Sequence, residues 1–298
     1  MGNANKLIWY IILPIILFLY VIFLIWSETL AQNQHWDYHT DIHSKNIISL
    51  ENPEGFILGG SNANAISASI MSNELNEKWY NLSLTGEGGN DKNYWRYIKL
   101  SISKENRDKV QNIVYSSATP LDDYGVRNRN SYFFRVLNSP KLLFLPYRSL
   151  ISQIKGYFTN KEALNFFDSL GDKRFDSSMC INQTLTILNR TKTNQSVLSS
   201  WVVSQLHNLK DLFPNAKITF VMPSEYYSSD EPQKIETVFK VINESINYFM
   251  SINKTTVTLV KQPPFPSIEM LCDDSLHANS AGRVWRTNNL LNTIQIGN

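Results

Sequence analysis

The longest apolar run of the sequence lies at its N-terminus. Residues 7–27 read LIWYIILPIILFLYVIFLIWS, with no charge between Lys6 and Glu28. At about 1.5 Å per helical residue, such a run is long enough to span a hydrocarbon core of roughly 30 Å. A cleaved signal peptide would have a shorter apolar stretch, of about 7–15 residues, ending at small residues. We therefore expect a signal anchor over residues 1–27, with a transmembrane helix at about 7–26. The weak charge bias of Lys6 favours a body outside the cytoplasm.

Beyond a polar stem over residues 28–54, short apolar runs alternate with helical patterns. The strand candidates are residues 56–58, 79–84, 110–116, 217–222 and 255–260, and the helix candidates are 62–77, 91–105, 195–212, 231–251 and 279–293. This alternation predicts a parallel sheet covered on both faces. We expect an α/β fold, a flavodoxin-like three-layer sandwich with a mostly parallel five-stranded sheet, over residues 55–298. Residues 120–194 break the alternation and are expected to form an insertion.

Composition and charge narrow the class of protein. Of 298 residues, 43% are hydrophobic, which excludes a disordered or fibrous chain. The 28 basic and 26 acidic residues give a net charge of +2, so no charge surplus favours binding to nucleic acid. Two cysteines are too few for a disulfide scaffold or a Cys-based zinc site. Cys180 and Cys272 are either a disulfide or two buried thiols, and both possibilities remain open.

Three polar segments each follow a strand or precede the last helix, and in open parallel sheets sites form at the carboxyl ends of the strands. The first is Gly59-Gly60-Ser61-Asn62. Its glycines permit a tight turn, after which Ser61 would begin a helix with its hydroxyl exposed and its N–H toward any developing negative charge. Ser61 is therefore either a nucleophile or a residue that merely caps the helix.

The second segment reads DSLH at residues 274–277, just before the predicted C-terminal helix. A serine hydroxyl becomes a good nucleophile when a base takes its proton, and histidine has a suitable pKa near neutral pH. An aspartate three residues earlier can accept a hydrogen bond from the other imidazole nitrogen and fix the tautomer. His277 and Asp274 are thus a candidate base and orienting acid. The alternatives are a turn cap for Asp274 and an ordinary surface position for His277.

The third segment is rich in glycine and reads TGEGGND at residues 85–91, after the second strand. A tetrahedral oxyanion needs two or three hydrogen-bond donors held in place beforehand. Gly86 would offer a backbone N–H, and Asn90 a side-chain amide. The other interpretation is a glycine-rich turn with a helix N-cap at Asn90 or Asp91.

Together these segments resemble the SGNH (GDSL-like) hydrolase family over about residues 55–295, most clearly in DSLHANSAG at 274–282. The resemblance implies that Ser61 is the nucleophile, His277 the base, Asp274 its orienting acid and Gly86 an oxyanion donor. We expect neither a cofactor nor a bound metal.

The sequence departs from the family at two points. Gly-Asp-Ser reads Gly-Gly-Ser at residues 59–61, and the Gly-x-Asn-Asp that usually follows the third strand follows the second here, at residues 88–91. For the asparagine donor, the alternatives are Asn90, Ser117 or a backbone amide in its place, or no such donor. Gly-x-Ser behind a single anchor is similar to the branch that handles acyl groups on extracytoplasmic polymers, such as alginate O-acetylation and teichoic-acid D-alanylation proteins.

Two functions follow from this resemblance. The first is a membrane-anchored extracytoplasmic serine esterase or O-acyltransferase, expected to use O-acetyl groups, which acts on a cell-envelope polysaccharide beside a multi-pass membrane acyltransferase. The second is a catalytically inactive subunit that keeps the fold and binds glycan or assists assembly. The replaced Asp and the displaced Asn favour the second, whereas Ser61, Asp274 and His277 together favour the first. A serine-reactive fluorophosphonate probe distinguishes the two.

Overall fold

A computed structural model describes two compact units of the chain. It describes residues 10, 12–20, 52–60, 62–83, 94–95, 98–99, 102–117, 168–172, 194–224, 232–272 and 278–296. One unit comprises Met1–Ile42 and Tyr132–Asn165, and the other comprises His43–Ser131 and Phe166–Asn298. In the first unit the described residues are an N-terminal helical segment with exposed apolar side chains, including Leu17 at 63% and Phe18 at 65%.

The expected transmembrane helix at about 7–26 lies only partly within the described residues. Among the helices that the structure describes, none combines the length and the apolar character that crossing a membrane requires. Most of the expected stem (28–54) and most of the expected insertion (120–194) lie outside the described residues.

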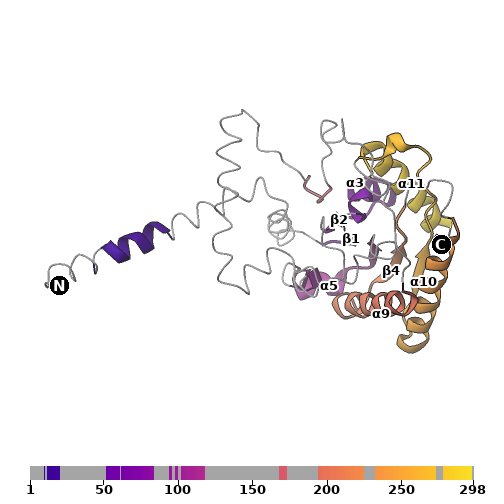
Figure 1. Cartoon of the computed structure of the whole chain (residues 1–298), viewed down its shortest axis with the longest axis horizontal. Helices are drawn as coiled ribbons and strands as arrows, with labels where there is room; N and C mark the ends of the chain where they lie inside the picture. The colour runs from indigo at the N-terminus through magenta and orange to yellow at the C-terminus, as the bar shows by residue number, and fades with distance from the viewer. Residues whose placement is uncertain are drawn as a thin grey trace. The chain divides into compact units, whose positions relative to one another are not determined.

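The second unit is built on a five-stranded parallel sheet, which confirms the expected α/β fold (Figure 1). The strands are β1 (Gly55–Gly59), β2 (Trp79–Asn81), β3 (Asn112–Ser116), β4 (Lys217–Val221) and β5 (Val257–Val260), in the order β2-β1-β3-β4-β5. This order is the flavodoxin order. Gly59 pairs with Ser116, Ser116 with Val221, and Val221 with Val260, so four strands end at the same level.

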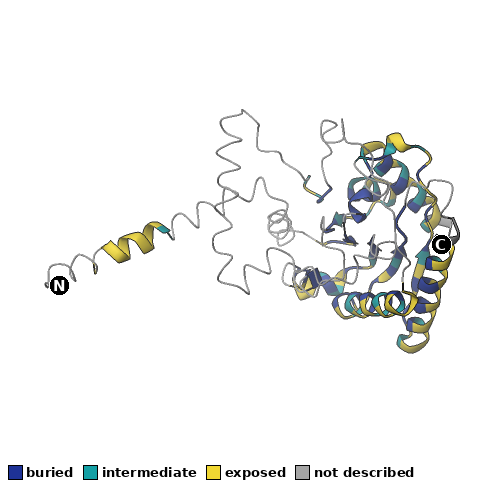
Figure 2. Ribbon diagram, viewed as in Figure 1, coloured by how far each residue is buried: buried dark blue, intermediate teal, exposed yellow. Residues whose placement is uncertain are grey.

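Helices cover both faces of this sheet. The helices in the described part of this unit are η1 (Ala63–Ala65), α3 (Ala68–Leu75), α5 (Lys104–Lys109), α9 (Gln195–Leu212), α10 (Pro232–Asn253), η5 (Ile268–Met270) and α11 (Ser280–Ile296). Figure 1 shows α3 and α11 on one side of the sheet and α9 on the other. Figure 2 shows dark blue strands between helices that carry both buried and exposed positions, as expected for a three-layer arrangement.

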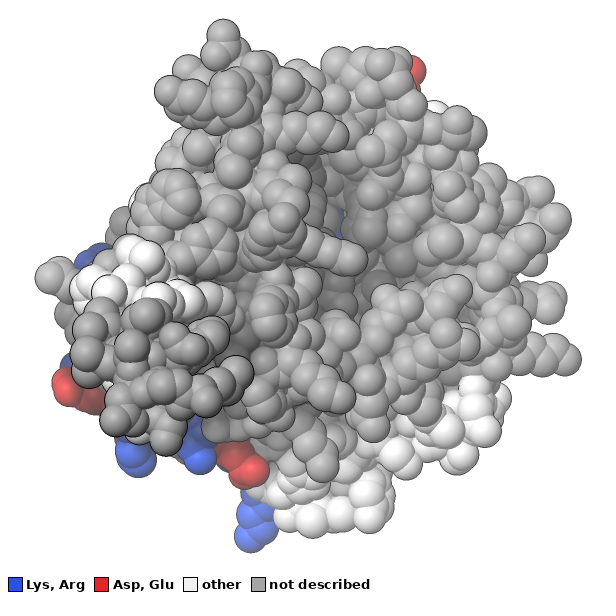
Figure 3. All heavy atoms as spheres, turned by 60° about the vertical axis from the view of Figure 1, so that its left-hand side comes forward, with Lys and Arg blue, Asp and Glu red and all other residues white. Residues whose placement is uncertain are grey.

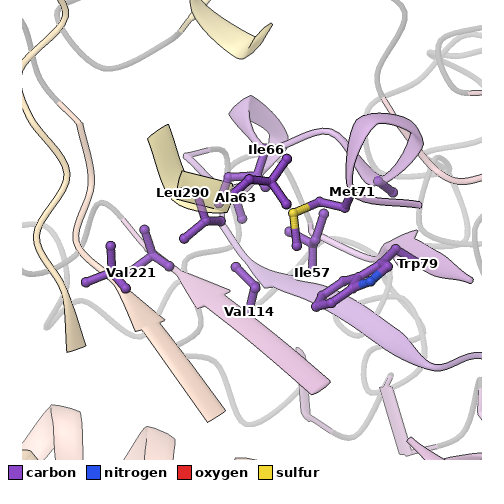
Figure 4. Close-up of a cluster of buried hydrophobic side chains, with 11 residues drawn as sticks. Ile57, Ala63, Ile66, Met71, Trp79, Val114, Val221 and Leu290 are labelled. Carbon is purple, nitrogen blue, oxygen red and sulfur yellow. The ribbon is translucent and has the colours of Figure 1, made fainter. Parts of the chain in front are cut away.

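Successive side chains of the strands point to opposite faces of the sheet and form a hydrophobic core on each face. Ile57, Val114, Val221 and Val260 point to the face covered by η1, α3 and α11, where they meet residues such as Met71 and Leu290 (Figure 4).

The opposite face of the sheet is aromatic. Phe56 packs on Phe213, and Tyr115 packs on Phe220 and on Trp201 of α9, with ring centroids 5.3–6.4 Å apart. Because successive residues of a strand point to opposite faces, both cores are encoded by the same short apolar runs.

Two predicted helices differ from the observed ones. Residues 62–77 do not form one helix, because Ile66 and Ser67 are extended and the Ser67 hydroxyl accepts from Ile70 N, starting α3 anew. The helix predicted over 91–105 does not continue to its predicted end. Ser103 is extended and caps a separate helix, α5.

Charged side chains of both signs lie together on the described surface. Figure 3 shows blue and red side chains side by side rather than in separate patches. Helix α5 contains two such pairs, Lys104 with Asp108 at 2.6 Å and Lys109 with Glu105 at 2.7 Å. The described part of this face therefore shows no patch of charges of one sign.

Candidate active site

The residues predicted to carry chemistry are bracketed by described residues. Ser61, Gly86, Asn90, Asp274 and His277 themselves lie outside the described residues. The described residues that border these segments, such as Gly60, Asn62, Ser83, Cys272 and Ala278, define the candidate site.

The turn after β1 requires glycine. Gly59 has a φ of +130°, and a Cβ built there would lie 1.8 Å from the carbonyl oxygen of Ser116. Gly60 N donates to the same carbonyl at 3.2 Å. On the other side of the strand, Gly59 N donates to the Tyr94 hydroxyl at 2.8 Å. The glycines thus let β1 pass close to β3 as it turns into the Ser61 segment, in agreement with the predicted tight turn.

The helices beyond this turn have caps of their own. Asn62 occupies the N-cap of η1, and Ser67 occupies the N-cap of α3 and accepts from Ile70 N at 3.2 Å. Ser61 itself lies outside the described residues, so both interpretations of it, nucleophile and helix cap, remain predictions. The Asn62 side chain is used differently, since its Oδ1 accepts from the Ser116 hydroxyl at 3.1 Å.

The glycine-rich segment is anchored to the same turn at both of its ends. On its N-terminal side, the Ser83 hydroxyl donates to Asn64 Oδ1 at 2.6 Å, and Asn81 Nδ2 donates to the Ile66 carbonyl at 2.8 Å. On its C-terminal side, Tyr94 accepts from Gly59 N. Described residues on both sides of the segment with Gly86 and Asn90 therefore contact the chain between Gly59 and Ile66.

The segment that contains Asp274 and His277 is closed by a short antiparallel bridge. Leu271 pairs with Ala278, and Asn279 N donates to the Met270 carbonyl at 2.9 Å. Because residues 271 and 278 are paired, the residues between them form a closed loop at the start of α11.

The sequence after the loop explains how α11 begins. The Asn279 side chain caps the helix by accepting from Ala281 N at 3.0 Å and Gly282 N at 3.1 Å. A Cβ at Gly282 would lie 2.3 Å from the Met270 carbonyl oxygen, so the close approach of η5 and α11 requires glycine here.

Cys272 begins this loop and is disulfide-bonded. Cys180 is the only other cysteine of the chain and lies outside the described residues. The disulfide alternative therefore holds for Cys272, and the alternative of a buried free thiol does not.

An apolar cluster joins the two predicted catalytic segments. Ala65, four residues after Ser61, is buried with Phe265, Leu271 and Ala278, and Ala278 directly follows His277. The flanks of the expected nucleophile and of the expected base thus share one small core at the carboxyl end of the sheet.

Sequence reasoning missed Arg286, which lies on α11 beneath this edge and is fully buried. Its Nε donates to Gln262 Oε1 at 2.6 Å, and its terminal nitrogens donate to the Asn62 carbonyl and to the Ser116 hydroxyl, the latter at 2.8 Å. Burial lowers the pKa of Arg286 to about 9, so the group stays charged at neutral pH. A signal was present in the sequence, because Gly282 and Leu290 lie four residues to either side and place Arg286 in the buried stripe of its helix.

Asp172 was missed as well, because it lies inside the expected insertion. It is 3% exposed and accepts from Ser67 Oγ at 2.7 Å, Ala68 N at 2.8 Å and Ser69 N at 2.9 Å. These contacts place a carboxylate at the N-terminus of α3, where it is favoured by the helix dipole. No local pattern signals it. Within the described part of the chain, no group of His, Cys, Asp or Glu residues is arranged to hold a metal ion.

Comparison with known proteins gives distant structural similarity alone. No protein-family model matches the sequence, and no curated protein matches it. An acetyl xylan esterase from the rumen bacterium Butyrivibrio proteoclasticus is 12% identical with a TM-score of 0.43, over 83% of this chain and 65% of that one. A family two carbohydrate esterase from Clostridium thermocellum, in complex with cellohexaose, is 10% identical with a TM-score of 0.46, over 83% of this chain and 66% of that one.

A salicylyl-acyltransferase from a tetracycline biosynthetic pathway is 8% identical with a TM-score of 0.41, over 84% of this chain and 56% of that one. The chain thus spans less than two thirds of the length of these structures. Similarity this distant assigns no role to any residue of this chain.

Proposed function

We propose that this protein is a serine esterase or O-acyltransferase that acts on a cell-envelope polysaccharide, anchored in the membrane by its N-terminal helix with the α/β unit outside the cytoplasm. One observation carries the proposal. The described flanks of Ser61 and of His277 share the cluster of Ala65, Leu271 and Ala278 at the carboxyl edge of a parallel sheet. In such sheets that edge is where ligands bind.

In the proposed reaction, the Ser61 hydroxyl attacks the carbonyl carbon of an acyl ester while His277 takes the hydroxyl proton. Asp274 accepts a hydrogen bond from the other imidazole nitrogen and stabilises the imidazolium. The N–H groups of Ser61 and Gly86, together with the Asn90 side-chain amide, hold the oxyanion. The intermediate then collapses, the sugar hydroxyl leaves with the proton from His277, and the acyl group stays on Ser61.

The acceptor decides between the two activities. Water, deprotonated by His277, would release the free acid and regenerate Ser61, which is the esterase reaction. A second sugar hydroxyl in the same place would receive the acyl group, which is the transferase reaction. The proposed anchor favours transfer, because a tethered enzyme stays beside a membrane acyltransferase that supplies acyl groups. The balance of 28 basic and 26 acidic residues suits a neutral or mildly charged polymer.

Labelling with a fluorophosphonate probe tests the proposal. The full chain should be labelled and should release acetate from an acetyl ester surrogate, and Ser61→Ala should abolish both. Ser251→Ala is the matched control, because Ser251 is an exposed serine near the end of α10 and should behave as the wild type does. Acetyl content of the envelope glycan, measured in cells that carry each variant, reports the reaction on the polymer.

The outcomes separate the two candidate functions. Labelling that depends on Ser61 supports the enzyme. A folded wild-type chain that resists the probe and releases no acetate refutes it and favours the inactive subunit that binds glycan or assists assembly.

A further inference from the structure

Arg286 is a buried cation whose acceptors are all neutral. Its side chain is fully buried, and it donates to the Asn62 carbonyl, to Ser116 Oγ at 2.8 Å, to the Met222 carbonyl at 3.4 Å and to Gln262 Oε1 at 2.6 Å. Burying a charge costs free energy unless that charge is paired and hydrogen-bonded. Here no carboxylate among the described residues accepts from the guanidinium, so core stability alone gives a poor reason for an arginine at this position.

The acceptors share one location. Asn62 follows β1, Ser116 ends β3, Met222 follows β4 and Gln262 follows β5. The guanidinium of Arg286 thus forms hydrogen bonds with residues at the carboxyl ends of four neighbouring strands, at the edge where the candidate site lies. A guanidinium suits this task because its donors form a rigid fork, whereas an ammonium is a compact point charge on a flexible stem.

Asn62 is the most informative of these acceptors, because it directly follows Ser61. Its carbonyl accepts from Arg286, and its side-chain oxygen accepts from Ser116 Oγ at 3.1 Å. Ser116 Oγ in turn accepts from Arg286. Backbone and side chain of Asn62 are therefore both held, one by the guanidinium directly and one through Ser116.

The other end of the connection is the helix that follows His277. Arg286 lies on α11, whose first residue is Ser280, and Gln262 Nε2 donates back to the Arg286 carbonyl at 3.0 Å. The side chain of Arg286 therefore fixes the start of η1 relative to α11.

We propose that Arg286 is a positioning residue that holds the turn carrying Ser61 in register with the helix that follows His277. This inference rests on the proposed function. Arg286 is fully buried and would not touch substrate. Its loss should therefore lower the rate of the chemical step and leave substrate binding unchanged, because a nucleophile displaced by about 1 Å can lose roughly 100-fold in rate.

The test measures fluorophosphonate labelling of the full chain as a function of probe concentration, which separates the saturating rate constant from the half-saturating concentration. In Arg286→Met the saturating rate should fall about 10- to 100-fold with an unchanged half-saturating concentration. Arg286→Lys keeps a hydrogen-bond donor without the fork and should lie between Met and wild type. Each variant is measured well below its own melting temperature, so that the folded fraction is constant.

Two further variants keep the test decisive. Ser116→Ala removes a neutral hydroxyl that bonds both Arg286 and Asn62, and it should lower the saturating rate severalfold even if the Arg286 variants do not fold. Arg107→Met is the matched control. Arg107 is also buried, at 9% exposure, and donates to the Lys99 carbonyl at 2.8 Å, but it lies on α5, ahead of β3. It should lower stability without changing the saturating rate.

The inference is overturned if Ser116→Ala and every folded Arg286 variant keep the wild-type saturating rate, or if Arg107→Met loses as much. Labelling that depends on Ser61 but not on Arg286 or Ser116 overturns this inference alone. A wild type that is not labelled, or a Ser61→Ala variant labelled as fast as wild type, overturns the proposed function, and the role of Arg286 falls with it.

Discussion

Replacing Tyr94 by phenylalanine removes one oxygen atom from the buried region beside β1. The Tyr94 side chain is 1% exposed, and its hydroxyl accepts from Gly59 N at 2.8 Å. Burial raises the pKa of Tyr94, so the hydroxyl stays protonated over the whole neutral range. Because Gly59 is buried as well, its N–H has no water to replace the lost acceptor.

The magnitude follows from the kind of group left without a partner. A buried donor that loses its acceptor costs about 1–3 kcal/mol, and the ring of the phenylalanine keeps the packing against Trp95. For a domain of about 150–250 residues, 1 kcal/mol lowers Tm by about 2–4 °C, so a loss of about 2 kcal/mol corresponds to roughly 4–8 °C.

Thermal unfolding of the full chain, followed by circular dichroism, measures this effect. Tyr248→Phe is the control, because Tyr248 is 61% exposed and should change the free energy of unfolding by less than about 0.5 kcal/mol. A Tyr94→Phe variant with the Tm of the wild type would refute the reasoning, since it would mean that Gly59 N does not depend on this hydroxyl.

Three further predictions concern the same edge of the sheet and its supports. Gly59→Ala should abolish folding or lower the free energy of unfolding by more than about 4 kcal/mol, because its Cβ would lie 1.8 Å from a backbone oxygen of Ser116. A soluble variant with the Tm of the wild type would contradict this. Asp172→Asn places an amide against the backbone donors at the start of α3 and should cost about 2–3 kcal/mol in urea unfolding, whereas the exposed Asp211→Asn should cost almost nothing. Burial, and after it repulsion from the Asp172 carboxylate, raises the pKa of the Asp168 carboxyl. The folded state therefore binds a proton more readily than the unfolded chain does, and the free energy of unfolding should fall as pH rises through the raised pKa. Asp168→Asn should therefore gain slightly in Tm at pH 7, and the gain should vanish as pH is lowered toward 4; a gain that does not change with pH would argue against titration of this group.

Elements with strong local signals were predicted well. The helix predicted over residues 195–212 coincides with α9, because Asn194 caps its start by accepting from Ser196 N at 3.1 Å and Pro214 follows its end. The two glycines before Ser61 were recognised as a tight turn, and Gly59 has the positive φ that only glycine adopts readily.

Elements that depend on distant contacts were predicted less well. The pattern at residues 62–77 contains enough apolar positions for one helix, yet the chain breaks at Ile66 and Ser67. The break is stabilised from elsewhere, since Asn81 binds the Ile66 carbonyl and Asp172 binds the Ser67 hydroxyl. Local periodicity contains no information about either partner.

The sequence by itself determined where the strands and most helices lie, that the sheet is parallel, and which segments follow its strands. These features depend on period and on short-range chemistry, which act within a few residues. The tertiary structure alone decided which atoms hold those segments together. Tyr94 reaches Gly59 across 35 residues, Asp172 reaches Ser67 across 105, and Arg286 reaches Asn62 across 224. A hydrogen-bond partner at such separations is set by how the crossovers fold back on the sheet, and no repeat in the chain encodes it.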